Sequence, residues 1–186
     1  GLQGNEQLCR VCFTLGKQET QKLLTESHHA YDTRIDDLLL TAVGYALRAL
    51  TQQSLNYVTL ERHGREAFDN APDVRDTVGW FTTMHPILIE VSDDLYRSIT
   101  AVKASHRQMP HNGIGYGILC STYGSEQAPL PPVSFNYLGQ FTDPSILSEQ
   151  KPVSDGHVVW HLDTTLCGIG KSPADKTTSD CTIDVT

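Results

Sequence analysis

The densest group of side chains able to do chemistry in this 186-residue sequence lies between Glu61 and Glu66. The stretch reads Glu-Arg-His-Gly-Arg-Glu and directly follows a short apolar and β-branched run, Tyr57–Leu60. A carboxylate at the end of a buried strand, beside a glycine where the chain can turn tightly, can be held in a cleft with a raised pKa. A general base needs these conditions. The alternative interpretation is a solvated turn in which Arg–Glu pairs offset one another.

Strand alternation predicts which of these side chains share a face. It places Glu61 on the face opposite the apolar Leu60. In a second expected strand, at residues 133–137, it places Phe135 and Tyr137 on one face and Asn136 on the other. We expect Glu61 and Tyr137 to line the same cavity, and side chains on opposite sides of the sheet would contradict this expectation.

Five motifs in order along the chain carry a resemblance to a known family. Residues 61–66 resemble the Glu-Gly-His-Gly-Arg-Glu motif of epimerization domains in nonribosomal peptide synthetases. Four further stretches match other motifs of that family: 37–42, 77–82, 110–117 and 135–141. One departure is Arg62, which stands where the family has glycine and adds charge and bulk beside the Glu61 carboxylate.

Both the pattern and the resemblance predict the fold class. Strands interleaved with helices indicate an α/β fold. The resemblance implies a chloramphenicol-acetyltransferase-like lobe, a mixed β-sheet packed with helices, in a family whose members have two such lobes around a tunnel. Residues 1–186 would then form most of the C-terminal lobe of an epimerization domain. The N-terminal lobe, with its His-His-x-x-x-Asp motif, and the extreme C-terminal end would be absent.

The resemblance also implies a reaction: inversion at Cα of an aminoacyl or peptidyl thioester. Glu61 would act as one acid/base group, across the tunnel from a histidine of the N-terminal lobe. Tyr137 would donate a hydrogen bond to the enolate oxygen or orient the substrate, with simple packing as the alternative. No cofactor is expected to bind directly, since the substrate arrives on the 4'-phosphopantetheine of a peptidyl carrier protein. The implied partners are that carrier protein, the N-terminal lobe and other synthetase domains.

Other motif residues are expected to support the site or to form its walls. The supporting residues are His63, Gly64, Arg65, Glu66 and Asn136. For Glu66 we expect an ion pair with Arg65. Three aromatic residues are expected in the core or in the wall of the substrate tunnel: Trp80, Phe81 and Phe135.

Two rival functions follow from the same residues. A condensation domain, which makes the peptide bond, shares the fold, although its typical sequences lack the Glu-x-His-Gly-Arg-Glu run. A non-catalytic lobe that only docks carrier protein is the other. His28 and His29 lie before an expected helix with the aspartate one residue too early for the His-His-x-x-x-Asp motif, so we expect a loop pair away from the cavity that binds no metal.

The composition argues against some classes of binding partner and indicates a cellular compartment. The formal charge of −8 argues against nucleic acid or an anionic membrane as the main partner. No apolar run approaches the roughly 18 residues of a membrane-spanning helix, and no signal peptide is visible. The five cysteines are odd in number and scattered, which is typical of reduced packing residues in a cytoplasmic protein.

Periodicity predicts the elements that position the motifs. The most regular helix spans residues 35–50, with the apolar face Leu39, Val43, Ala46, Leu47 and Leu50. A second helix, at 94–108, has Leu95, Ile99 and Val102 on its inner side. Gly44 inside the first helix indicates close backbone packing. Shorter helices are expected at 17–27 and near Ile118, and strands at 8–15, 57–60, 87–91, 133–137, 158–162 and 181–185.

Overall fold

The computed structural model describes residues 11–27, 29–66, 73–123, 129–139 and 181–185. Its elements are α1 (Lys17–Thr25), α2 (Ile35–Thr51), β1 (Leu55–Arg62), β2 (Thr83–Glu90), α3 (Leu95–Gln108), the 3-10 helix η1 (Pro110–Gly113), α4 (Tyr116–Tyr123), β3 (Val133–Tyr137) and β4 (Cys181–Val185). The α/β class predicted from the sequence is therefore confirmed. The strand expected at 158–162 lies outside the described residues. None of the helices in the described ranges is long and apolar enough to cross a bilayer.

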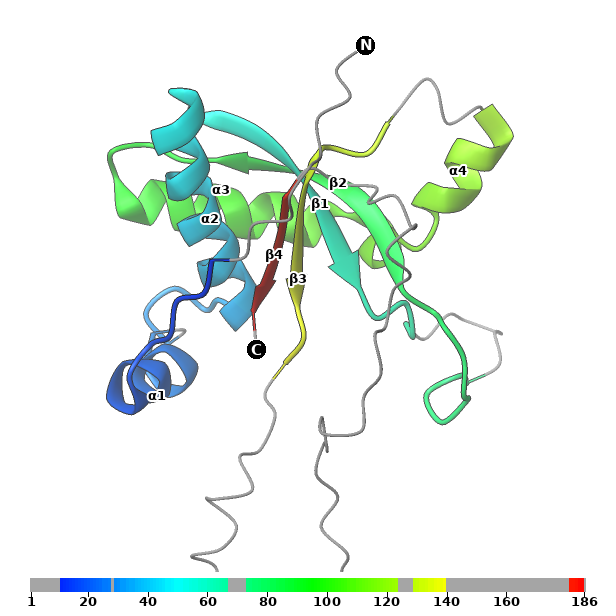
Figure 1. Ribbon diagram of the computed structural model, residues 1–186, viewed down its shortest axis with the longest axis horizontal. Helices are drawn as coiled ribbons and strands as arrows, with labels where there is room; N and C mark the ends of the chain where they lie inside the picture. The colour runs from blue at the N-terminus through cyan, green and yellow to red at the C-terminus, as the bar shows by residue number, and fades with distance from the viewer. Residues whose placement is uncertain (1–10, 28, 67–72, 124–128, 140–180, 186) are drawn as a thin grey trace, which may run out of the picture.

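The described strands form a mixed sheet in the order β2-β1-β3-β4 (Figure 1). β1 is antiparallel to β2 and parallel to β3, and β3 is parallel to β4. The carboxyl ends of the parallel strands β1, β3 and β4 therefore lie at one end of the sheet, together with the start of β2. Among the described strands β2 lies at the edge of the sheet, where a strand can lack the ladder donor that Pro86 does not have. It begins at Thr83 and runs through Pro86, so it starts four residues before the strand expected at 87–91.

Helices α2 and α3 cover one face of this sheet. The apolar core between them includes Leu40, Val43 and Leu47 of α2, Val102 of α3, and Val58, Leu60, Ile87, Ile89 and Phe135 of the strands. Because the strand members occupy alternate positions, they all point to the helical face. Gly44 lets α2 approach the sheet, since a Cβ there would lie 2.5 Å from Cγ2 of Ile89. The close packing predicted for Gly44 is confirmed.

The helices lie at the predicted positions in the sequence, but the side chains that they bury differ in part from the predicted apolar faces. In α2, Leu40 is fully buried whereas Leu50 is 81% exposed. In α3, Leu95 is exposed, and the polar Ser98 and His106 are buried beside the expected apolar residues. Burial of these two polar side chains is possible because both form hydrogen bonds: Ser98 with the connection between β2 and α3, and His106 with Asp37 of α2. Apolar periodicity alone does not register polar residues of this kind.

The N-terminal strand expected at Leu8–Leu15 is wrong for its described part. From residue 11 onward the backbone is irregular, and Val11 and Phe13 are 88% and 86% exposed. Alternation makes a strand only where a neighbouring edge satisfies the backbone groups, and no described strand pairs with this segment. Cys12 and Cys181 are exposed, so the packing role expected for the cysteines is wrong for these two.

Candidate functional site

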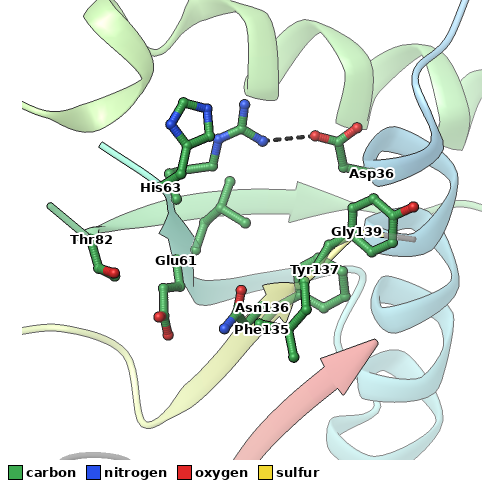
Figure 2. A pocket seen from close by; sticks show the side chains of 11 residues that line it. Asp36, Glu61, His63, Thr82, Phe135, Asn136, Tyr137 and Gly139 are labelled. Atoms are coloured by element: carbon green, nitrogen blue, oxygen red, sulfur yellow. Dashed lines mark hydrogen bonds and ion pairs between the residues drawn. The ribbon is translucent and has the colours of Figure 1, made fainter. Parts of the chain in front are cut away.

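A hollow of about 470 Å³ opens at the sheet edge where β1 and β3 end. Its lining comes from the end of β1, the residue before β2, the end of β3 and the first turn of α2: Leu60 to His63, Thr82, Phe135 to Gly139, and Asp36 (Figure 2). Ligands of open α/β sheets bind outside the carboxyl ends of the strands. The position of this hollow therefore makes it the candidate active site.

Glu61 and Asn136 point to the same side of the sheet. Leu60 of β1 and Phe135 of β3 are the last ladder partners of the two strands, and Glu61 and Asn136 are the residues that directly follow them. Residues in register on parallel strands share a face. Figure 2 shows the Glu61 carboxylate and the Asn136 amide on the same side, away from Asp36 of α2. The sequence had given Asn136 only a supporting role, and the register makes it the polar neighbour of the carboxylate.

Tyr137 lines the same hollow but from the opposite face, which corrects our expectation. Its ring points toward α2 (Figure 2) and packs against the core together with Phe135. The reason is strand alternation beyond the last ladder pair, Leu60 with Phe135: Tyr137 shares the face of Phe135, whereas Glu61 points to the other face. The packing alternative for Tyr137 is therefore the one that the structure favours.

The residues after Glu61 are held by specific contacts. Arg62 forms an ion pair with Asp36 of α2, with 2.7 Å between Nη1 and Oδ2, and both side chains are mostly buried. Gly64 has a φ of +64°, and a Cβ there would collide with the carbonyl oxygen of Phe81. Only glycine fits such a turn without strain. The backbone at the end of β1 is thus held by the ion pair of Arg62 and by the tight turn at Gly64.

Arg65 organises the loop that leads into β2. Its guanidinium stacks on the Phe81 ring, 4.4 Å from the ring centroid. It also donates hydrogen bonds to four backbone carbonyls, those of Val74, Arg75, Thr77 and Gly79. The planar fork of arginine suits such a role because it presents several donors in fixed directions. The prediction that Arg65 fixes the loop near Glu61 agrees with this geometry.

Glu66 differs from the ion pair expected with Arg65. Its Oε1 lies 3.5 Å from Nε2 of His63, and the ion pairs of the described residues include none between Glu66 and Arg65. The guanidinium of Arg65 is already engaged by the loop carbonyls, which explains the difference.

The three aromatic residues expected in the core or tunnel wall have separate fates. Phe135 is fully buried in the core and borders the hollow. Phe81 lies beneath Arg65. Trp80 is 89% exposed and does not line the hollow, so its place in the core is wrong. Roles in the wall of a tunnel between two lobes stay a prediction for Trp80 and Phe81.

A buried polar network on the helical face was missed from the sequence. Asp37 is fully buried, and its carboxylate accepts hydrogen bonds from Nδ1 of His106 at 2.7 Å and from the Arg34 backbone amide at 2.8 Å. Burial by itself raises the pKa of Asp37, but these hydrogen bonds and the nearby positive charge bring that pKa below its usual value. A signal was present, because Ile99, Val102 and His106 continue one helical stripe.

His85 of β2 points to the helical face of the sheet, as Ile87 and Ile89 do, and lies near this network. It is 1% exposed and packs against Gly113, whose φ of +81° leaves no room for a side chain. Neither of its ring nitrogens has a hydrogen-bond partner. Burial, followed by the charges of Arg62 and His106, lowers the pKa of His85 to about 4.

This lowered pKa predicts an acid-sensitive fold. The unfolded chain binds a proton at His85 below pH 6.5 and the folded chain only near pH 4, so stability falls as pH drops through that window. We expect about 2 kcal/mol of loss between pH 7 and pH 5 from this group. Urea unfolding of wild type and His85→Leu measures it: the variant should show a flatter pH profile over this range. Parallel profiles would contradict the assignment.

The histidine pair lies partly outside the described residues, which exclude His28. His29 lies in a turn between α1 and α2 and is not among the residues that line the hollow. This placement agrees with the expected loop position away from the cavity.

Comparison with known proteins identifies the family. Residues 3–159 match the model of the condensation domain. The N-(5-amino-5-carboxypentanoyl)-L-cysteinyl-D-valine synthase of Amycolatopsis lactamdurans is 50% identical over 175 residues, which is 94% of this chain and 4% of that protein. Bacitracin synthase 2 of Bacillus licheniformis is 37% identical over 93% of this chain and 6% of its own length. The chain thus spans only a small part of these relatives.

Solved structures agree with this placement. The epimerization domain from the third module of tyrocidine synthetase B superposes with a TM-score of 0.63 at 39% identity, over 72% of this chain and 32% of that one. The first condensation domain of the CDA synthetase gives a TM-score of 0.52 at 17% identity, over 66% and 27%, and shares the fold. The chain therefore belongs to the condensation-domain superfamily found in nonribosomal peptide synthetases.

Proposed function

We propose that this chain supplies one acid/base carboxylate, Glu61, of an epimerization domain. The substrate is an aminoacyl or peptidyl thioester on the 4'-phosphopantetheine of a peptidyl carrier protein, in the cytoplasm. The observation that carries the proposal is the position of Glu61: it is the penultimate residue of β1, borders the hollow at the carboxyl end of the strand and points away from the helical face. In this scheme Glu61 exchanges a proton with Cα on one face of the substrate. A histidine of the N-terminal lobe serves the other face.

The chemistry suits a positioned carboxylate. The Cα–H bond next to a thioester is weakly acidic, so the base has to lie within hydrogen-bond distance of that proton. Asn136, on the same face, is placed to donate a hydrogen bond to the substrate or to the enolate oxygen. Tyr137 points to the other face and is left with a packing role.

Two of the relatives support inversion over peptide-bond formation. The solved epimerization domain is 39% identical to this chain, whereas the condensation domain is 17% identical. The product in the name of the Amycolatopsis lactamdurans synthase contains D-valine, and making a D residue from an L-amino acid requires inversion at Cα. The family model, which is that of the condensation domain, keeps peptide-bond formation as the second candidate.

Solvent deuterium incorporation tests the proposal. We expect a complete domain containing this chain to place deuterium at Cα of a carrier-bound aminoacyl thioester in D₂O. The isolated chain should show none, because one half of the acid/base pair is missing. Peptide-bond formation without Cα exchange would favour the condensation reaction, and carrier binding with neither activity would favour a docking lobe. Exchange by the isolated chain would contradict the need for two lobes.

A further inference from the structure

Arg62 and Glu61 are neighbours in β1 and point to opposite faces of the sheet. The Arg62 guanidinium forms an ion pair with Asp36 of α2. Figure 2 shows the Glu61 carboxylate directed away from Asp36. The ion pair is 2.7 Å long, and its side chains are only 14% and 12% exposed. Any force that holds Arg62 in place therefore also holds the stretch of backbone that carries Glu61.

The end of β1 has little other lateral support. On the β2 side, Glu61 and Arg62 have ladder partners in Met84 and Thr83. On the β3 side, the ladder pairs of β1 in the described residues end at Leu60. The last two residues of β1 are therefore paired on one side only, and the Arg62–Asp36 ion pair provides an anchor from a third direction.

Asp36 is itself held by two helices. It lies in the first turn of α2, next to the fully buried Asp37. His106 of α3 contacts both carboxylates: its Nδ1 lies 2.7 Å from Oδ1 of Asp37, and its Nε2 lies 3.9 Å from Oδ2 of Asp36. The anchor thus runs from β1 through α2 to α3, and it does not depend on a mobile surface group.

We propose that Arg62 is a positioning residue, which fixes the Glu61 carboxylate through its buried ion pair with Asp36. The inference rests on the proposed function of Glu61. Arg62 occupies the position of a glycine in the motif that this chain resembles, so the anchor is a property of this chain and not of the motif. Arg62 borders the hollow from the helical face, so a substrate bound on the face of Glu61 would lie on the other side of β1 from its ion pair with Asp36.

Positioning of this kind affects turnover more than binding. A misplacement of about 1 Å of a catalytic group can cost about 100-fold in rate. We therefore expect Arg62→Met, which keeps bulk but removes the charge, to lower kcat about 10-fold to 100-fold. The KM for the carrier-bound substrate should stay the same. Arg62→Lys, which restores a charge for Asp36, should recover most of kcat.

The test is a double-mutant cycle in the complete domain. Arg62→Met, Asp36→Ala and their combination are compared by D/L interconversion, below the unfolding temperature of each variant. Because both residues act through one contact, the double variant should lose no more activity than either single variant. Additive losses, or an unchanged kcat in Arg62→Met, would overturn the proposal. The matched control is Arg48→Met. Arg48 lies in α2, as Asp36 does, and its ion pair is with Asp93, an exposed residue before α3, so its loss should leave kcat unchanged.

Amide hydrogen exchange separates this inference from the proposed function. In Arg62→Met the amides at the end of β1 should exchange about 10-fold faster than in wild type, while those in the middle of β1 stay protected. This measurement needs no enzymatic activity. If the wild-type domain shows no Cα exchange, the proposed function fails and the amide data still decide whether Arg62 anchors β1. Unchanged protection at the end of β1 would overturn the anchor.

Discussion

Glu61→Gln in a complete epimerization domain should lower the rate of D/L interconversion by about 10²–10⁴, the usual effect of losing a general acid–base group. Glutamine keeps the shape and hydrogen bonding of the side chain at the end of β1 but cannot take up the Cα proton. The measurement is the interconversion rate on the carrier, started from each enantiomer, because two opposed groups can contribute unequally to the two directions. Full activity in both directions would leave the motif with a structural role only.

Three variants at other residues of the motifs show whether such a loss is specific. Glu66→Gln should cost much less, since Glu66 contacts His63 and not the face of Glu61. Tyr137→Phe should change almost nothing, because its ring packs toward α2. Asn136→Ala should fall between Glu61→Gln and these two, because the Asn136 amide shares the face of the carboxylate. A large loss in Tyr137→Phe would restore the catalytic role that the resemblance implied.

Asp37→Ala should lower the free energy of unfolding by about 1–3 kcal/mol, the usual cost of leaving a buried polar group without its hydrogen-bond partner. The substitution leaves the His106 ring without its acceptor and removes the hydrogen bond to the first turn of α2. Urea unfolding at pH 7 measures the change. The control is Asp93→Ala, whose ion pair with Arg48 is exposed and should be worth less than about 1 kcal/mol.

The pH dependence of this effect has a defined sign. The folded pKa of Asp37 lies below its ordinary value of 3.8. Its carboxylate therefore stabilises the fold above that value, and this contribution is lost as pH falls further. The difference between wild type and Asp37→Ala should be largest near neutral pH and should shrink below pH 3.8. A difference that does not change with pH would place the effect of Asp37 in packing alone.

Local pattern was sufficient for the elements that carry the candidate site. The periodic run that became α2 and the β-branched run that became β1 were predicted within a few residues of their observed bounds. Gly44 was also interpreted correctly, because a glycine inside an otherwise regular helix costs stability unless backbones approach closely there. Signals of this kind depend on neighbours within a few residues, which the sequence displays directly.

Long-range pairing decided what the pattern could not. The segment with Val11 and Phe13 alternates like a strand, yet no described strand pairs with it. Trp80 lies in an apolar patch, yet its ring is exposed, while Arg65 binds the backbone carbonyls of Thr77 and Gly79 in the same loop. Both outcomes depend on contacts with distant segments, so neither could be predicted from local composition.

The sequence by itself determined the order of the motifs and the alternation within each strand. Alternation alone places the residues next to Glu61 and next to Asn136 on the opposite face of the sheet. The tertiary structure alone decided the register between β1 and β3, because a shift of one residue would exchange Asn136 for Tyr137 beside the carboxylate. It also decided that Asp36 meets Arg62, since the two are brought together only when α2 packs across the sheet. Alternation is a property of one strand, whereas register and helix docking depend on how the core packs.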